Sequence, residues 1–230
     1  MRLLDLFCGA GGAAVGYHRA GFEVVGVDLE PQPHFPFEFH QADAMTYPLE
    51  NFDVIHASPP CQGYSRMRNL PWLRNKSYPL LIEPTRQRLL ATDCLWVIEN
   101  VMDAHLPAGW LCGGMFGLSV YRHRAFETNF FWLQPAHPRH RRVIEAGRML
   151  GGRLRRAHKD MKLDWMSSGE LAEAIPPAYT EYIGRQLLKM LSSREEVANE
   201  VVTRSSQLAD GSAAGAGDGP APAQRKQVRS

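Results

Sequence analysis

Short apolar runs separated by polar or glycine-rich stretches occupy the first 130 residues of the chain. The apolar runs expected to form strands are residues 1–7, 23–27, 52–57, 94–98 and 125–129. Residues 13–20, between the first two runs, have the character of a helix. The order of strand, turn, helix and strand predicts an α/β fold, and 230 residues with 44% hydrophobic content suffice for one compact core.

A glycine-rich turn, Cys8-Gly-Ala-Gly-Gly12, joins the first expected strand to the helix. Its glycines allow the backbone to approach a ligand closely and to turn into the helix. Asp28, at the end of the second strand, suits the hydroxyl groups of a ribose, and Asp43, at the end of residues 39–42, is placed to face an adenine amino group. These features favour a nucleoside-type cofactor. A nicotinamide dinucleotide fits less well, because the turn lacks the third glycine of that fingerprint and Asp5 has no role in it.

The segment Ser58-Pro-Pro-Cys-Gln-Gly-Tyr-Ser65 follows the expected strand at 52–57. Its two prolines take the chain out of the sheet, because proline cannot donate to a ladder of hydrogen bonds. Cys61 is therefore presented beyond the carboxyl end of a strand, the edge at which open α/β sheets bind ligands. A thiol in this position is suited to nucleophilic catalysis, whereas an isolated cysteine in a proline-rich loop is more often structural.

Four motifs, taken in their order along the chain, resemble those of one protein family. The segments are Asp5-Leu-Phe-Cys-Gly-Ala-Gly-Gly12, Pro60-Cys61-Gln62, Glu99-Asn100-Val101 and Arg122-His-Arg124. They resemble the S-adenosylmethionine, nucleophile, catalytic-glutamate and paired-arginine motifs of the cytosine-C5 DNA methyltransferases. The resemblance covers residues 1–130, and 165–191 more loosely, with a reduced target-recognition region between them. It implies a doubly wound, mostly parallel sheet of the S-adenosylmethionine-dependent methyltransferase (Rossmann-like) type, with helices on both faces.

The resemblance also implies the chemistry of the site. The thiolate of Cys61 would add to C6 of a cytosine flipped out of duplex DNA, so that C5 can take a methyl group from S-adenosyl-L-methionine. Glu99 would contact N3 and the exocyclic amine of the base, and Arg124 would face its O2. Arg122 would hold the thiol loop or a phosphate. A role in restriction–modification is an expectation of the same kind.

Further residues are expected to bind the cofactor or the nucleic acid. The expected cofactor-binding residues are Asp5, Phe7, Gly9, Gly11, Gly12, Asp28, Leu29, Asp43, Ala44 and Pro60. The expected nucleic-acid-binding residues are Gln62, Ser65, Arg66, Arg68, Arg153, Arg155 and Arg156. The last three belong to residues 137–162, which contain nine Lys and Arg against two acids in a chain of net charge only +2. Such a local excess of positive charge favours contact with phosphates.

The same features divide the chain into four segments. We expect a catalytic and cofactor-binding core at 1–134 and a short basic target-recognition segment at 135–166. Ser167-Ser-Gly-Glu170 resembles a capping box and predicts that C-terminal helices at 167–192 return to the core. Residues 206–230 are rich in Ser, Ala, Gly and Pro, so we expect a disordered tail within 193–230.

Cysteine and histidine usage predicts that the chain has no metal site. No Cys-x-x-Cys spacing occurs, and the histidines, among them His34, His40, His56 and His105, suggest no cluster of ligands. No apolar run reaches membrane-spanning length. Four scattered cysteines without a signal peptide indicate an intracellular protein, cytoplasmic in a bacterium or encoded by a phage, and we expect a monomer.

Two alternatives to a DNA methyltransferase stay open. One is the same chemistry on RNA, which a comparison of duplex DNA with folded RNA as substrates would distinguish. The other is a catalytically silent DNA-binding protein. The intact set of Cys61, Glu99, Arg122 and Arg124 argues against the second, because a pure binding protein has no use for an exposed thiol opposite a buried acid.

Overall fold

The computed structural model describes residues 1–70, 76–107, 109–140 and 152–213. Its strands are β1 (Arg2–Leu6), β2 (Glu23–Asp28), β3 (Glu38–Gln41), β4 (Val54–Ala57), β5 (Leu95–Asn100), β6 (Gly109–Leu111) and β7 (Arg124–Thr128). Within the described part of the chain they form a seven-stranded sheet in the order β3-β2-β1-β4-β5-β7-β6. Neighbours from β3 to β5 are parallel, whereas β7 runs antiparallel to both β5 and β6. The predicted mostly parallel α/β fold is confirmed.

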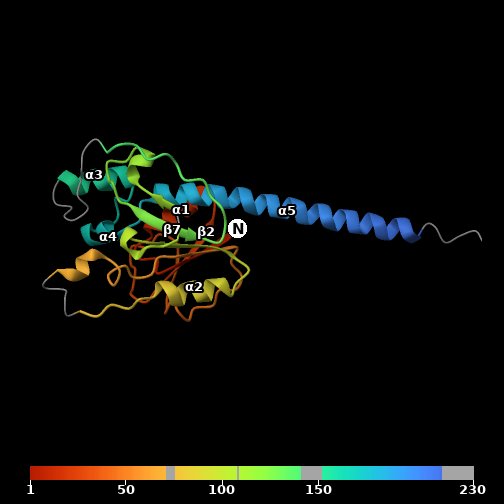
Figure 1. The fold of residues 1–230 in the computed structure, drawn as a ribbon, viewed down its shortest axis with the longest axis horizontal. Helices are drawn as coiled ribbons and strands as arrows, with labels where there is room; N and C mark the ends of the chain where they lie inside the picture. The colour runs from red at the N-terminus through yellow and green to blue at the C-terminus, as the bar shows by residue number, and fades with distance from the viewer. Residues whose placement is uncertain (71–75, 108, 141–151, 214–230) are drawn as a thin grey trace, which may run out of the picture. The chain divides into compact units, whose positions relative to one another are not determined.

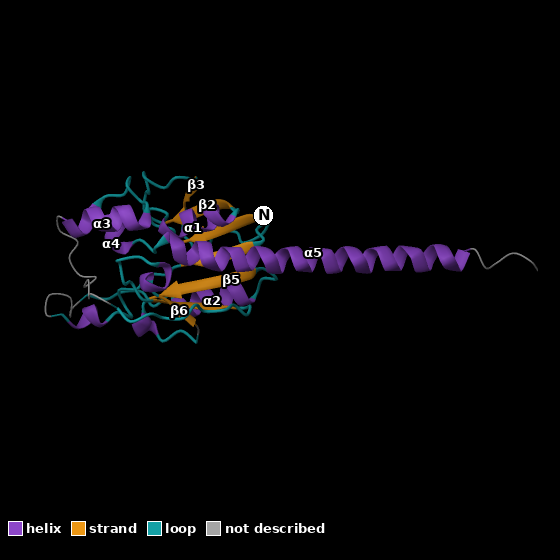
Figure 2. Cartoon of the chain, turned by 90° about the horizontal axis from the view of Figure 1, so that it is seen from above, coloured by secondary structure: helices purple, strands orange, loops and turns teal. Residues whose placement is uncertain are grey.

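Helices cover both faces of this sheet (Figure 1, Figure 2). The α-helices are α1 (Gly12–Ala20), α2 (Ile82–Leu90), α3 (Gly152–Met161), α4 (Ser168–Glu173) and α5 (Pro177–Ala213), and the 3-10 helices are η1 (Arg66–Asn69), η2 (Met102–Ala104) and η3 (Gly113–Phe116). Leu89 of α2 packs into the core on one face. Tyr17 of α1 bonds to His56 of β4 on the other. The sheet is therefore doubly wound, as expected.

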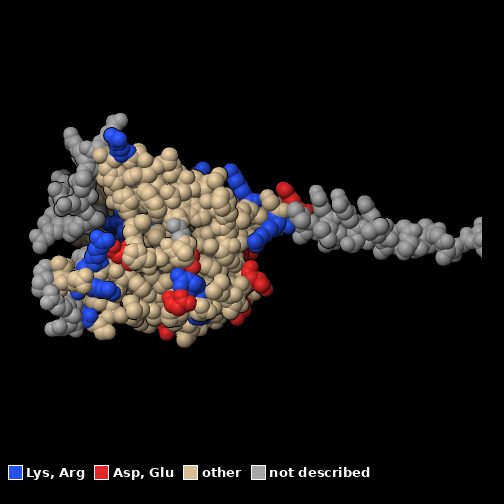
Figure 3. All heavy atoms as spheres, in the orientation of Figure 1, with Lys and Arg blue, Asp and Glu red and all other residues tan. Residues whose placement is uncertain are grey.

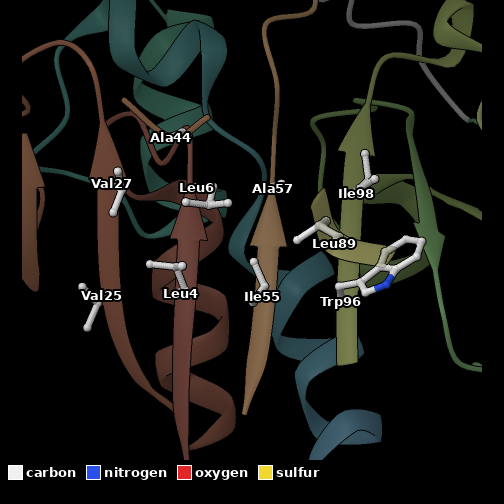
Figure 4. Close-up of a cluster of buried hydrophobic side chains, with 10 residues drawn as sticks. All are labelled: Leu4, Leu6, Val25, Val27, Ala44, Ile55, Ala57, Leu89, Trp96 and Ile98. Atoms are coloured by element: carbon white, nitrogen blue, oxygen red, sulfur yellow. The ribbon is translucent and has the colours of Figure 1, made fainter. Parts of the chain in front are cut away.

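The core on the α2 face is built from the central parallel strands. Its buried side chains are Leu4, Leu6, Val25, Val27, Ala44, Ile55, Ala57, Leu89, Trp96 and Ile98 (Figure 4). Because side chains alternate along a strand, the residues between them on β1 and β4, Asp5 and His56, point to the face that α1 covers. The apolar face fixes the register of the strands, and the opposite face carries the buried polar groups of the site.

The start of α5 packs tightly against α1. Thr180 Oγ1 donates a hydrogen bond to the Ala13 carbonyl oxygen at 2.8 Å. A Cβ atom on Gly16 would lie 2.2 Å from the Pro177 carbonyl oxygen, and one on Gly12 would lie 2.6 Å from the Ile175 carbonyl oxygen. Both glycines are therefore required by this close approach. The contact holds the C-terminal segment beside the helix that begins at the glycine turn.

The C-terminal helices differ from the sequence prediction in their extent. The capping box is present, with Ser167 accepting from the Glu170 N–H and Glu170 accepting from the Ser167 N–H. However, α5 begins at Pro177 and continues to Ala213, through most of the expected disordered tail. Residues 192–209 contain neither Pro nor Gly and are rich in helix formers, which explains the extension. The chain divides into two compact units, Met1–Leu188 and Lys189–Ser230, and residues 214–230 lie outside the described part.

No helix in the described ranges is both long enough and apolar enough to cross a bilayer.

Candidate active site

The carboxyl ends of β1 and β2 meet at the glycine turn. Phe7, Gly9 and Gly11 have positive φ angles of 59°, 49° and 90°, a region that residues other than glycine rarely occupy. The Gly9 N–H donates to Asp28 Oδ2 at 2.9 Å, and the Glu30 N–H donates to Asp28 Oδ1 at 3.0 Å. The turn is thus fixed against the strand end that carries the expected ribose-binding carboxylate.

Asp5 lies near the carboxyl end of β1 and is fully buried. Neither of its side-chain oxygens accepts an aligned hydrogen bond from the described residues. Burial, together with the charges of Asp28 and Glu99, raises the pKa of Asp5 well above its ordinary value, and the backbone N–H of Ala14 opposes this shift. Asp5 therefore has unused hydrogen-bonding capacity beside the glycine turn, which is unfavourable in a ligand-free protein.

The other expected cofactor-binding residues follow the ends of neighbouring strands. Leu29 comes directly after β2 and its residue surface is 65% exposed. Asp43 and Ala44 follow β3, where Asp43 Oδ1 accepts from the Met45 N–H at 2.8 Å. Pro60 follows β4. Because parallel strands end at one edge, the expected cofactor-binding residues converge on the carboxyl edge of β1 to β4.

The thiol loop is anchored to β5. Asn100 Nδ2 donates to the Pro59 carbonyl oxygen at 2.8 Å. The Cys61 carbonyl oxygen accepts from the N–H groups of Tyr64 and Ser65, both at 3.0 Å, so the chain turns directly after the thiol. Cys61 is half-buried with a free thiol. Burial raises the pKa of this thiol and Arg124 lowers it, while Glu99 raises it and a backbone hydrogen bond lowers it. The positive charge of Arg124 is therefore the main influence that favours the thiolate.

Glu99 is buried on β5, next to that anchor. Glu99 Oε1 lies 3.0 Å from Arg124 Nε, so the two side chains form an ion pair. This Oε1 atom accepts no aligned hydrogen bond from the described residues. Burial raises the pKa of Glu99, while Arg124, a hydrogen bond from Ser58 and Arg122 lower it. The carboxyl group is thus oriented by an ion pair and still has an acceptor oxygen available to a ligand.

Arg122 makes contacts that differ from those expected. Instead of the thiol loop, its guanidinium donates to the carbonyl oxygens of Leu171, at 3.2 and 3.3 Å, and of Ala174. The Tyr179 hydroxyl donates to the Arg122 carbonyl oxygen at 2.5 Å. Burial lowers the pKa of Arg122 to about 10. The guanidinium satisfies carbonyl groups at the C-terminal end of α4, which helix ends leave without intrahelical partners. Tyr179 of α5 holds the Arg122 backbone, so the residue joins the start of β7 to both helices.

Comparison with known proteins finds similarity to one family over the N-terminal part of the chain. Residues 1–101 match the sequence profile of the C-5 cytosine-specific DNA methylases. This match covers less than half of the 230-residue chain. A type II methyltransferase, M1.HphI of Haemophilus parahaemolyticus, is 37% identical over 79 residues, a match that covers 27% of this chain and 21% of that protein. The matched part thus spans about a fifth of the length of this curated relative.

Two solved structures also resemble part of this chain. A prophage-encoded protein from E. coli, described as a DNA modification methyltransferase, shares 23% sequence identity with a TM-score of 0.42, over 55% of this chain and 45% of that one. The S. pombe Dnmt2 methyltransferase shares 18% identity with a TM-score of 0.39, over 58% of this chain and 51% of that one.

The expected nucleic-acid-binding residues of this chain occupy two regions. Gln62 is exposed beside the thiol. Arg66 pairs with Asp103 at 2.9 Å, and Arg68 donates to the Gly63 carbonyl oxygen at 2.7 Å. Ser65 lies between Gln62 and Arg66, in the turn after the thiol. Some of the Lys and Arg side chains lie at the left of the view in Figure 3, the side on which this loop lies in Figure 1, and others lie elsewhere on the same face.

The second region is the basic segment after β7. Arg153, Arg155 and Arg156 belong to α3, but the side chains of residues 152–156 lie outside the described part, as do residues 141–151. The prediction that these arginines bind phosphate therefore stays a prediction.

Sequence reasoning did not identify a buried polar chain that leads to Glu99. The Tyr17 hydroxyl lies 3.0 Å from His56 Nδ1, and His56 Nε2 lies 2.8 Å from Ser58 Oγ. Burial lowers the pKa of His56 to about 3, so its ring is neutral. A neutral ring has one donor and one acceptor nitrogen, and it therefore orients the Ser58 hydroxyl that bonds to Glu99. The signal for this chain is His56 itself, a polar residue within an apolar strand.

The histidines also differ from the sequence prediction, which found no cluster of ligands. His123, His137 and His140 lie together with Cys112. The four residues come from separate positions in the sequence, and folding of β6 and β7 brings them together. Only the His-x-x-His spacing of residues 137–140 was visible beforehand.

Proposed function

We propose that this protein transfers a methyl group from S-adenosylmethionine to C5 of cytosine in DNA, through a covalent adduct of Cys61 with C6 of a flipped base. One observation carries the proposal. The Cys61 loop is tied by Asn100 to the strand that presents Glu99, and Glu99 is buried against Arg124 with an acceptor oxygen still available. A nucleophile, an acid and a cation therefore meet at one strand edge.

The residues of the glycine turn fit S-adenosylmethionine. Asp28 would accept from the ribose hydroxyls beside the two backbone N–H groups that already hold it. Exposed Leu29 offers an apolar surface to the adenine, and Asp43 an acceptor for its amino group. The buried oxygens of Asp5 accept no aligned hydrogen bond from the described residues, so a ligand near the turn that supplies a donor or a positive charge would satisfy them. When bound, the cofactor supplies an electrophilic methyl group on a sulfonium.

The side chains beyond β4 and β5 would act on the base. Cys61 Sγ forms a bond to C6, which breaks aromaticity and makes C5 nucleophilic. Glu99, whose pKa is raised by burial, shares or donates a proton at N3 as negative charge develops there. Arg124 stabilises the same charge at O2. After C5 takes the methyl group, loss of the C5 proton to solvent and expulsion of Cys61 restore the aromatic ring.

A base-trapping assay tests this function directly. In the presence of S-adenosylmethionine, duplex DNA that contains 5-fluorocytosine should form an adduct with the wild-type chain that survives denaturation. Once C5 has taken the methyl group, fluorine at C5 blocks the final elimination that would release Cys61. Cys61→Ser should form no adduct, since a hydroxyl is far less ionised than a thiol at neutral pH. Cys94→Ser is the matched control, because Cys94 is also a half-buried free cysteine, and it should react like the wild type.

The nucleic-acid class is tested by product analysis. Mass spectrometry of nucleosides, after incubation with duplex DNA or with folded RNA, should show 5-methylcytosine in the DNA. Methylation of the RNA alone would refute DNA as the substrate. No product on either substrate, with cofactor binding intact, would favour the catalytically silent alternative.

A further inference from the structure

A compact group of sulfur and nitrogen atoms lies apart from the thiol loop. Cys112 Sγ and one ring nitrogen each of His123, His137 and His140 all lie within 4.8 Å of one another. Cys112 is buried between β6 and η3, and His123 immediately precedes β7. His137 and His140 belong to the segment that leaves β7. Four potential ligand atoms thus converge from three parts of the chain.

Hydrogen bonding among these side chains does not account for their convergence. His140 Nε2 lies 3.1 Å from Cys112 Sγ and 2.9 Å from His137 Nε2. An imidazole nitrogen has either one N–H or one lone pair, so it cannot satisfy two partners at once. A cation at the common centre would instead receive a lone pair from each residue.

We propose that Cys112, His123, His137 and His140 form a tetrahedral site for a divalent cation of the zinc class. Thiolate and imidazole are the ligands that zinc prefers, with Zn–S and Zn–N distances of about 2.3 and 2.0–2.1 Å. A tetrahedron with those bonds has nitrogen–nitrogen separations of about 3.3 Å. The observed span therefore needs only small ring rotations to close on an ion. The Cys112 thiol loses its proton to solvent on binding.

Aromatic rings support the proposed ligands from outside. Tyr121 stacks on His140 with ring centroids 4.0 Å apart and an interplanar angle of 2°. Trp110 contacts His137 at 4.9 Å and His123 at 5.4 Å between centroids. These contacts restrict the rings to orientations in which their nitrogens converge. Such preorganisation lowers the entropic penalty of metal binding.

The position of the site indicates a structural role. Four protein ligands leave no open coordination position for a substrate, as in other structural zinc sites. His123 lies between Arg122 and Arg124, and His137 and His140 begin the segment that leads to the basic α3 region. A bound ion would therefore join the start of that segment to the strand that carries Arg124. This inference does not depend on methyl transfer.

Metal content and cobalt spectroscopy test the proposal on the full chain. Protein produced with zinc and purified without chelator should contain about one zinc per chain. The chelator-treated protein should bind Co²⁺ with the visible bands of tetrahedral coordination and a thiolate charge-transfer band. Cys112→Ser should lose the thiolate band, and His137→Gln should bind Co²⁺ at least about tenfold more weakly, because even outer-shell changes weaken metal sites about 10–100-fold.

The controls keep both variants interpretable. His137 is exposed, so His137→Gln should fold like the wild type even if Cys112→Ser does not. His40→Gln changes another exposed histidine, paired with Glu38 on β3, and should leave metal binding unchanged. A wild-type chain that binds neither zinc nor Co²⁺ would overturn the proposal. Equal Co²⁺ affinity in the wild type and His137→Gln, or an unchanged thiolate band in Cys112→Ser, would overturn it as well.

Discussion

Gly16→Ala tests the close packing that positions the glycine-turn helix. Gly16 lies in α1 opposite the first turn of α5. An added Cβ atom would lie 2.0 Å from Thr180 Oγ1, 2.2 Å from the Pro177 carbonyl oxygen and 2.7 Å from the Glu181 backbone nitrogen. Two of these are backbone atoms, which cannot rotate away. Because an ordinary contact needs about 3.5 Å, the start of α5 must move away from α1 by about 1 Å.

The magnitude follows from three effects. Overpacking of this kind costs about 1–3 kcal/mol. The displacement also weakens the hydrogen bond from Thr180 Oγ1 to the Ala13 carbonyl oxygen, which contributes about 1 kcal/mol. The higher helix propensity of alanine restores about 1 kcal/mol. The free energy of unfolding should therefore fall by about 1–3 kcal/mol.

Urea unfolding of the two variants Gly16→Ala and Gly169→Ala measures this difference. Gly169 lies in α4, where an added Cβ has no neighbour within 4 Å, so its change to alanine should be neutral or stabilise by up to about 1 kcal/mol. Gly16→Ala should also weaken cofactor binding, because α1 begins at the glycine turn. The packing argument is refuted if Gly16→Ala is at least as stable as the wild type.

Three further predictions concern buried charges. Asp5→Asn should gain stability relative to the wild type as pH rises above about 4, by up to about 1.4 kcal/mol per pH unit. The raised pKa of Asp5 makes the folded wild type bind the proton more tightly than the unfolded chain, so the stability of the wild type falls as the pH rises. A difference in urea unfolding that does not vary with pH would contradict this. Arg122→Met should lower the free energy of unfolding by about 3 kcal/mol or more, since it leaves the Leu171 and Ala174 carbonyl groups without their donor. Arg122→Lys should restore only part of the lost melting temperature. Glu99→Gln should lower the methylation rate about 100-fold or more, and the loss should increase at high pH. A small loss of rate that does not vary with pH would show that Glu99 has only a structural role.

The sequence predicted the central strands well because their burial is simple. β1, β2, β4 and β5 are continuous apolar runs, which a buried parallel sheet requires. α2 was missed because only Ile82, Thr85 and Leu89 of its residues are buried, and Pro84 interrupts the helical pattern. β6 has three residues, of which only Leu111 is buried. Short or weakly amphipathic elements obtain their stability from tertiary contacts that a local pattern does not contain.

The site was predictable where its residues are contiguous in the sequence. The glycine turn, the Cys61 loop and the Glu99 strand each place their groups through local structure. The contacts of Arg122 depend instead on where α4 and α5 return. The cluster of Cys112 with the three histidines likewise depends on the antiparallel pairing of β6 with β7. Long-range topology decides these contacts, and spacing along the chain does not encode it.

The buried acids explain why this site should be completed by its ligands. Asp5 and Glu99 lie on the same side of the sheet. Burial raises the pKa of both carboxyl groups, and the charge of Glu99 raises the pKa of Asp5 further. Both carboxyl groups have oxygens that accept no aligned hydrogen bond from the described residues. Their oxygens are therefore unfavourable in the free protein and become favourable when a ligand supplies donors or positive charge. Cys61 follows the same logic, because burial keeps the pKa of its thiol raised and Arg124 is the cation that opposes it. Under the proposed function, a base that bonds to Glu99 would release Arg124 from its ion pair. Binding of the base would then be coupled to activation of the Cys61 thiol.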